Sequence, residues 1–268
     1  MDKGMGDDLR QVGVVTKYEI LKHTRSKRML VFSGIAVLLF ILITVLNFVF
    51  DGKLPSDPDE FMMGYVGTVS LLVILGVSLF CASAIASEFE ERTALLMFPR
   101  PIKKTSFFTG KVLACYAVCG GIIVAYYAVC MLLCLINTVS LNMSAFASLG
   151  YALPFMLGAG GFAFLISSVS GRGAIAVVIT IATLLLVFQM VDGMLYVFHV
   201  EPVFSITYAS VDILNVIQGN TTWVQDFPEL GISISNYYPA HWLSITVMST
   251  WFLVTTVLAA VIFKRREF

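Results

Sequence analysis

Long stretches without a charged residue are the feature that most restricts how this chain can fold. A helix needs about 20 apolar residues to cross the roughly 30 Å of hydrocarbon in a bilayer. Several stretches have that length, and one, residues 112–171, is long enough for two helices and is interrupted by polar Asn137, Asn142 and Ser144. The stretches predict six transmembrane spans, at residues 29–50, 63–87, 110–136, 147–169, 173–193 and 242–263.

The composition agrees with a membrane protein. Of the 268 residues, 58% are hydrophobic and only 13% are charged, whereas roughly a quarter of the residues in a soluble domain are charged. The first apolar stretch has full span length and follows 28 mixed residues, so a cleaved leader peptide is not expected. We expect an all-α integral membrane fold that forms a single transmembrane domain over residues 1–268.

The basic residues predict how the spans are oriented. Cytoplasmic loops of membrane proteins carry an excess of Lys and Arg. With six spans, every Lys and Arg except Lys53 falls on one side, although the formal net charge is zero. We therefore expect a multi-pass protein of the cell (plasma) membrane with both termini in the cytoplasm. The opposite side carries carboxylates instead: Asp51, Asp57, Asp59, Glu60, Glu201, Asp212, Asp226 and Glu229.

Residues 8–28, before the first span, mix basic with apolar side chains. The apolar positions can form one stripe of a helix with cations around it, as in helices that lie on an anionic inner leaflet. We predict an interfacial amphipathic helix that contacts the lipid bilayer; a solvated basic leader is the alternative. The stripe comprises Leu9, Val12, Tyr18, Ile20 and Leu21, and the cations are Lys17, Lys22, Arg25 and Arg28.

One large segment lies on the outer side, at residues 200–240 between spans five and six. Residues 203–217 are mostly apolar, follow Pro202 and end before Gly219, which predicts a short helix. Such a segment is a re-entrant or interfacial helix at the outer leaflet, or a small external cap. A re-entrant hairpin would have to pack against spans five and six, because irregular backbone at membrane depth must be buried in protein.

Small residues gather in the second and fourth spans. Small side chains let helices approach closely where no hydrophobic effect separates helix from lipid. We interpret these positions as packing contacts rather than as contacts with a substrate. They are Gly76, Ser78, Ala82, Ala86, Gly158, Gly160 and Gly161.

Four of the five cysteines, Cys115, Cys119, Cys130 and Cys134, lie on the third span and share one face of a helix. Thiolate pairs spaced four residues apart could hold a soft ion such as Cu(I). The two pairs are roughly 22 Å apart along a helix axis, so they cannot form one four-ligand site. Packing within the membrane is the preferred interpretation, and no metal site is expected.

Residues for catalysis or ion-driven transport are scarce. The chain has no Gly-x-x-x-x-Gly-Lys-Ser/Thr loop, because Gly110 and Lys111 are followed by Val112, so it is not expected to hydrolyse ATP by that route. Ion-coupled transport needs ionisable groups at membrane depth. The candidates are Gln189 and Asp192 near the outer end of span five, and we expect Asp192 to be an interfacial cap. We expect neither an enzyme nor a bound cofactor.

Segment 88–101, between spans two and three, carries the clearest functional pattern. Acidic residues stand at its beginning and basic residues follow its end, which matches the dipole of a short helix. Pro99 and Pro101 prevent that helix from continuing. Leu95, Leu96 and Phe98 give it apolar surface that a cytoplasmic turn would not need. The segment either docks on a partner or rests as an amphipathic loop on the lipid headgroups.

This segment resembles the ABC-2 permease pattern: a glutamate, an acidic-Gly-Thr step, a leucine pair, a proline, and a Gly-Lys that enters the next helix. Arg92 departs from the pattern, because the family usually has glycine there. Two further stretches are similar to the family, residues 167–174 with Ser167 and Ser168, and residues 263–267. The residues that match in and after the segment are Glu88, Glu91, Arg92, Thr93, Leu95, Leu96, Pro99 and Lys111, the last at the cytoplasmic entry of span three.

The resemblance implies that residues 88–101 are a coupling helix that seats in a cleft of a separate cytosolic ATPase subunit. It also implies an exporter with two permeases, identical or paralogous, and partner subunits that bind ATP and Mg. No nucleic acid is expected as a partner. A non-transporting membrane scaffold or sensor, and less readily a membrane enzyme or channel, are the alternatives. The docking residues would be Glu88, Glu91, Arg92, Thr93, Leu95, Leu96, Phe98 and Pro99.

Overall fold

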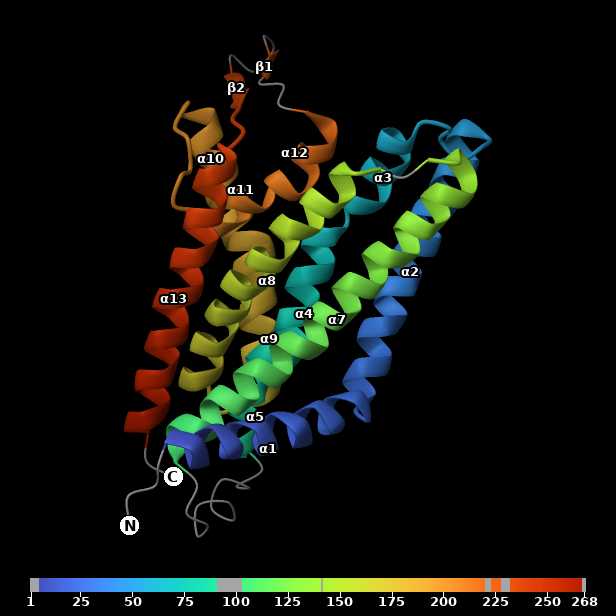
Figure 1. Ribbon diagram of the computed structural model, residues 1–268. Coiled ribbons are helices and arrows are strands. Elements are labelled where there is room, and N and C mark those ends of the chain that lie inside the picture. Colours follow the sequence, from blue (N-terminus) through green and yellow to red (C-terminus); the bar gives the residue numbers. More distant parts are fainter. Residues whose placement is uncertain (1–4, 91–102, 141, 220–222, 228–231, 267–268) are drawn as a thin grey trace.

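The computed structural model describes residues 5–90, 103–140, 142–219, 223–227 and 232–266. Six helices in this part of the chain are long and apolar enough to cross a membrane, and they form one bundle (Figure 1). The predicted all-α membrane fold is therefore confirmed. The six candidate spans are Lys27–Phe50, Pro58–Glu90, Lys104–Thr138, Ser144–Val169, Gly173–Val197 and His241–Arg265.

Helix α1, Met5–Thr24, runs across the end of the bundle at which the last helix, α13 (His241–Arg265), finishes (Figure 1). We call this the α1 end. Helix α1 stops at Thr24 rather than at the predicted residue 28, because Ser26 starts the next helix. The Ser26 side chain accepts a hydrogen bond from the backbone N–H of Met29 (3.4 Å), as an N-cap does. Several apolar side chains of α1 are exposed: Leu9, Val14, Tyr18 and Leu21.

The first span, α2 (Lys27–Asp51), lies at the edge of the bundle (Figure 1). The second span is built from three helices, α3 (Pro58–Val66), α4 (Val69–Ala84) and α5 (Ala86–Glu90). It begins at Pro58 rather than at residue 63, because Asp57 caps the helix and proline fits its first turn.

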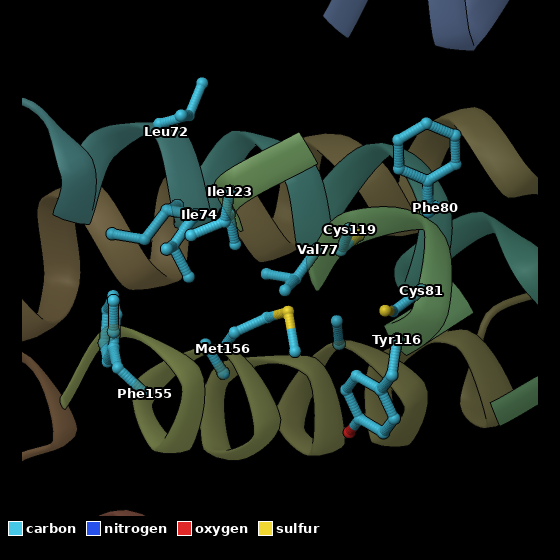
Figure 2. Packing of buried hydrophobic residues seen from close by; sticks show 14 of the residues in the cluster. Leu72, Ile74, Val77, Phe80, Cys81, Tyr116, Cys119, Ile123, Phe155 and Met156 are labelled. Carbon is cyan, nitrogen blue, oxygen red and sulfur yellow. The ribbon is translucent and has the colours of Figure 1, made fainter. Parts of the chain in front are cut away.

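Helix α4 forms the centre of the packing. It contacts α7 (Lys104–Thr138), α8 (Ser144–Val169) and α9 (Gly173–Ala182). Figure 2 shows part of this core, to which α4 contributes Leu72, Ile74 and Val77, α7 contributes Ile123, and α8 contributes Met156. Span five continues from α9 through a π-helical turn, residues 183–187, into α10 (Phe188–Val197).

The described residues between 200 and 240 form two short helices and two paired strands at the opposite end of the bundle, which we call the hairpin end (Figure 1). Helices α11 (Ile206–Ser210) and α12 (Asp212–Gln218) largely coincide with the predicted helix over 203–217. All of α11 is buried, in contact with α8, α10 and α13, as a re-entrant segment requires. Strands β1 (Trp223–Phe227) and β2 (Ile232–Asn236) pair in antiparallel fashion, and the sequence analysis does not predict this hairpin.

Close packing at the small residues is confirmed. A Cβ atom at Gly158 of α8 would lie 2.9 Å from the backbone oxygen of Met248 on α13, and one at Gly76 of α4 would lie 2.6 Å from the ring of Phe32. The cysteines of α7 are buried as free thiols. Within the described residues, no group of three or more His, Cys, Asp or Glu side chains could hold a metal ion. The other small residues at buried positions are Ser78, Ala82, Ala86, Gly160 and Gly161.

We expect Gly158→Ala to lower the thermal unfolding temperature of the purified protein, because the added methyl group would press on the backbone of α13. Overpacking of this kind costs roughly 1–3 kcal/mol. The matched control is Gly150→Ala on the same helix, where a Cβ atom meets nothing within 4 Å. Equal unfolding temperatures for the two variants would contradict the close approach of α8 to α13.

Candidate functional site

A buried group of charges lies at the α1 end, where α1, α5 and α7 meet. The ammonium of Lys111 on α7 donates hydrogen bonds to Oε1 of Glu19 on α1 (2.7 Å) and to Oε1 of Glu88 on α5 (2.9 Å). The exposed fractions of Lys111, Glu19 and Glu88 are only 2%, 6% and 3%. We call these three residues the ion triad.

Two more residues of α1 extend the triad. Lys22, which is half exposed, donates to Oε1 of Glu88 (3.1 Å), so two cations face two carboxylates. His23 Nε2 lies 3.9 Å from Oε2 of Glu19, and its ring packs edge-on against Phe80 of α4 at 5.4 Å between centroids. Helix α1 is therefore bound to the bundle along one face.

The sequence around the triad explains why α1 can approach α7 so closely. Gly110 directly precedes Lys111, and a Cβ atom at Gly110 would lie only 2.7 Å from the side chain of Val15. The carbonyl oxygen of Gly110 accepts a hydrogen bond from the Thr16 hydroxyl (3.3 Å). The absence of a side chain at Gly110 thus lets α1 approach α7, and Lys111 then binds Glu19 of α1.

Burial decides how firmly the triad holds its helices. Charges taken out of water are stabilised only when close partners of opposite charge satisfy them. Lys111 has two carboxylate acceptors within 2.9 Å, and charge-assisted hydrogen bonds are roughly twice as strong as neutral ones. Removing one partner would leave the remaining buried charges with reduced compensation. The triad therefore fixes α1, α5 and α7 relative to one another.

Helix α5 is also bound to the connection between α8 and α9. The hydroxyl of Ser167 on α8 accepts hydrogen bonds from the backbone N–H groups of Ile85 and Ala86 (3.0 Å each). The carboxylate of Glu90 accepts a hydrogen bond from the N–H of Gly173 (2.9 Å), the first residue of α9. An anion is favourable at this position, because the N-terminus of a helix carries partial positive charge.

The C-terminal end of α13 contacts both α5 and the connection between α8 and α9. The guanidinium of Arg266 lies 3.9 Å from the ring centroid of Phe89 on α5 and donates to the carbonyl oxygens of Ser168 (2.9 Å) and Ser170 (3.0 Å). Phe89 also contacts Phe263 edge-on, at 6.4 Å between centroids. The three stretches that resemble the ABC-2 pattern therefore converge on α5, although they are far apart in the sequence.

Among the predicted site residues, the structure thus joins Glu88 and Lys111. Their partners on α1 were missed by the sequence analysis. A signal for Glu19 does exist, because it is the only carboxylate between residues 9 and 50, in an otherwise basic segment. The remaining residues predicted for the coupling helix lie outside the described residues: Glu91, Arg92, Thr93, Leu95, Leu96, Phe98 and Pro99.

The predicted polar residues of span five lie far from the triad, on α10 at the hairpin end. Asp192 is 6% exposed, and its Oδ2 accepts hydrogen bonds from the hydroxyls of Ser205 (2.9 Å) and Thr207. It is therefore bound to the segment that follows α10. Gln189 lies one turn earlier and lines a cavity together with Asp192.

We expect Lys111→Met to lower the thermal unfolding temperature strongly, because it leaves Glu19 and Glu88 buried with reduced compensation. Breaking a buried ion pair costs roughly 3–5 kcal/mol. Adding Glu19→Gln removes one of the two carboxylates that lost Lys111 and should recover part of the loss, so the effects of the two substitutions will not be additive. Strictly additive unfolding free energies in this double-mutant cycle would contradict a coupled triad.

The comparison with curated proteins found no match. A family model described as ABC-2 family transporter protein matches residues 15–188. This range contains all three residues of the ion triad, part of α1 and the whole of α7. Because the matched range covers more than half of the 268 residues, this chain belongs to the ABC-2 transporter family.

Proposed function

We propose that this chain is the permease subunit of an ATP-driven ABC exporter, worked by a separate ATPase subunit. Membership of the ABC-2 family supports a permease role in ABC transport and implies an ABC ATPase as partner. The chain itself has no Gly-x-x-x-x-Gly-Lys-Ser/Thr loop, which is the usual cradle for the phosphates of ATP. In this proposal the partner binds ATP and Mg, and the permease moves its substrate outward.

The observation that carries the proposal is the fixation of α5. This helix contains the first residues of the predicted coupling helix, 88–101, and its carboxylates are bound on two sides. Glu88 binds Lys111 of α7, and Glu90 binds the N-terminus of α9. A displacement of residues 88–101 by the ATPase would therefore reach two transmembrane helices through two short bonds, of which the one between Glu88 and Lys111 is buried. Such contiguous contacts are what energetic coupling between distant sites requires.

A second permease copy or a paralogue would complete the transporter. In the second span 78% of the apolar window is buried, against 6% in the first and 17% in the fifth and sixth spans. The poorly buried spans therefore present wide apolar faces to lipid or to another transmembrane subunit. Pairs of like subunits around a two-fold axis are the commonest assembly, so we propose a transporter of two six-helix halves. The substrate would pass between these halves.

The orientation in the membrane completes the proposal. The α1 end carries the basic residues of α1, the connection between α8 and α9 with Arg172, and the end of α13 with Lys264, Arg265 and Arg266. Basic residues mark the cytoplasmic side. This end would therefore face the cytosol, where an ATPase can reach it.

Labelling of introduced cysteines tests this orientation. We expect Lys53→Cys to react with a membrane-impermeant thiol reagent in intact cells and Arg172→Cys to react only after permeabilisation, because they lie at opposite ends of the bundle. The five native cysteines are buried and should give a low background. Labelling of Arg172→Cys from outside would reverse the orientation.

Docking of the ATPase is tested at the apolar residues of the predicted coupling helix. Leu95→Asp combined with Leu96→Asp should prevent co-purification of the ATPase and abolish stimulation of ATP turnover. Each leucine buried at an interface contributes roughly 1.5–3 kcal/mol, and aspartate would reverse that contribution. Membrane insertion should be normal, because both positions lie outside the predicted spans.

The matched control is Leu95→Met, which preserves apolar volume and should retain both the ATPase and transport. If the double aspartate variant still transports, residues 88–101 form a surface turn and the proposed function loses its main support. If the wild-type complex hydrolyses ATP but moves no substrate in vesicles, the chain is a membrane scaffold or sensor rather than a permease.

A further inference from the structure

A cavity of about 460 Å³, lined by both polar and apolar groups, lies at the hairpin end. It is enclosed by the start of α4 and its preceding turn, by α10, and by the short helices α11 and α12, all of which Figure 1 places away from the α1 end. Its volume is within the range of sites for small organic molecules. The cavity is thus large enough for a ligand and is separate from the ion triad.

Asp192 gives this cavity a buried acceptor that the fold does not use. One carboxylate oxygen, Oδ2, accepts hydrogen bonds from Ser205 and Thr207. The other, Oδ1, is buried without a hydrogen-bond partner among the described residues. A buried acceptor left without a donor is unfavourable. Because Asp192 also lines the cavity, a ligand there that supplies a positive charge or a donor would compensate this carboxylate.

The rest of the lining favours a cation. None of the described residues that line the cavity is Lys, Arg or His, whereas three are tyrosines: Tyr196, Tyr208 and Tyr238. The hydroxyl of Tyr208 donates to the carboxylate of Glu201, and its ring contacts that of Tyr196 edge-on, at 6.4 Å between centroids. Aromatic rings next to a carboxylate are the usual surroundings of bound organic ammonium ions.

We propose that this cavity binds an organic ammonium ion, with Asp192 as its counter-ion and the tyrosine rings as its walls. The side-chain amides of Gln189 and Gln218, which also line the cavity, would bind polar groups elsewhere on the ligand. A metal ion is a poorer occupant, because Asp192 is the single Asp, Glu, His or Cys among the described lining residues. Binding here needs no ATPase, so its failure would leave the proposed transport function untouched.

Isothermal titration of the purified protein with choline tests the site. The protein is kept in maltoside detergent, because phosphatidylcholine would present the same headgroup. The matched probe is the neutral alcohol in which a carbon atom replaces the nitrogen of choline. We expect choline to bind and the alcohol to bind about tenfold more weakly or worse, since one desolvated cation–π contact or ion pair accounts for a factor of this order.

Asp192→Asn should weaken choline binding by about tenfold or more, because the amide retains an acceptor for Ser205 and Thr207 but removes the charge. The matched control is Asp59→Asn, a carboxylate on α3 that accepts a hydrogen bond from Asn142 (2.6 Å) and is absent from the cavity lining. It should leave the affinity unchanged.

Tyr196→Leu provides a second arm that keeps the carboxylate. It should also weaken choline binding. If the thermal unfolding profile of Asp192→Asn shows that this variant does not fold, Tyr196→Leu alone tests whether the cavity binds choline. Equal affinities for choline and the neutral alcohol, or unchanged affinity in the variants of the cavity, would overturn the proposal. No heat of binding at millimolar choline would overturn it as well.

Discussion

The ammonium of Lys111 is the group around which the α1 end is organised. A cation cannot stay in an apolar interior without acceptors, and here the acceptors come from α1 and α5, far from α7 in the sequence. Satisfying one charge thus joins three separate parts of the chain. Helix α1 is predicted to lie on the inner leaflet, and the structure shows that one of its faces belongs to the protein core.

The six spans could be predicted because the thickness of the bilayer sets the length of an apolar stretch. Their ends could not, as Pro58 and Lys104 show. The first turns and caps lie in polar sequence outside the hydrocarbon, where hydropathy carries no signal. The hairpin of β1 and β2 was missed for a related reason, because a short two-stranded ribbon needs no apolar periodicity.

The candidate site was only partly predictable. The resemblance to ABC-2 permeases led to Glu88 and Lys111, but Glu19 enters the triad only because α1 packs on Gly110. Such a contact between distant residues leaves no mark in local periodicity. The position of Asp192 is a similar case, since its burial depends on α11 folding back against α10. Local pattern identifies the chemical groups, whereas tertiary packing decides which of them meet.

The glycines of α8 also bear on how the bundle can move. With the backbone of α13 against Gly158, and threonine side chains of α13 against Gly161, neither helix can slide along the other without driving a larger neighbouring side chain into the contact. We therefore expect α8 and α13 to move together as one rigid body. A movement of α5 would instead be passed to α7 and α9, the helices to which its carboxylates are bound. The close approach of α8 to α13 would thus confine rearrangement to the interfaces of these two helices with the rest of the bundle.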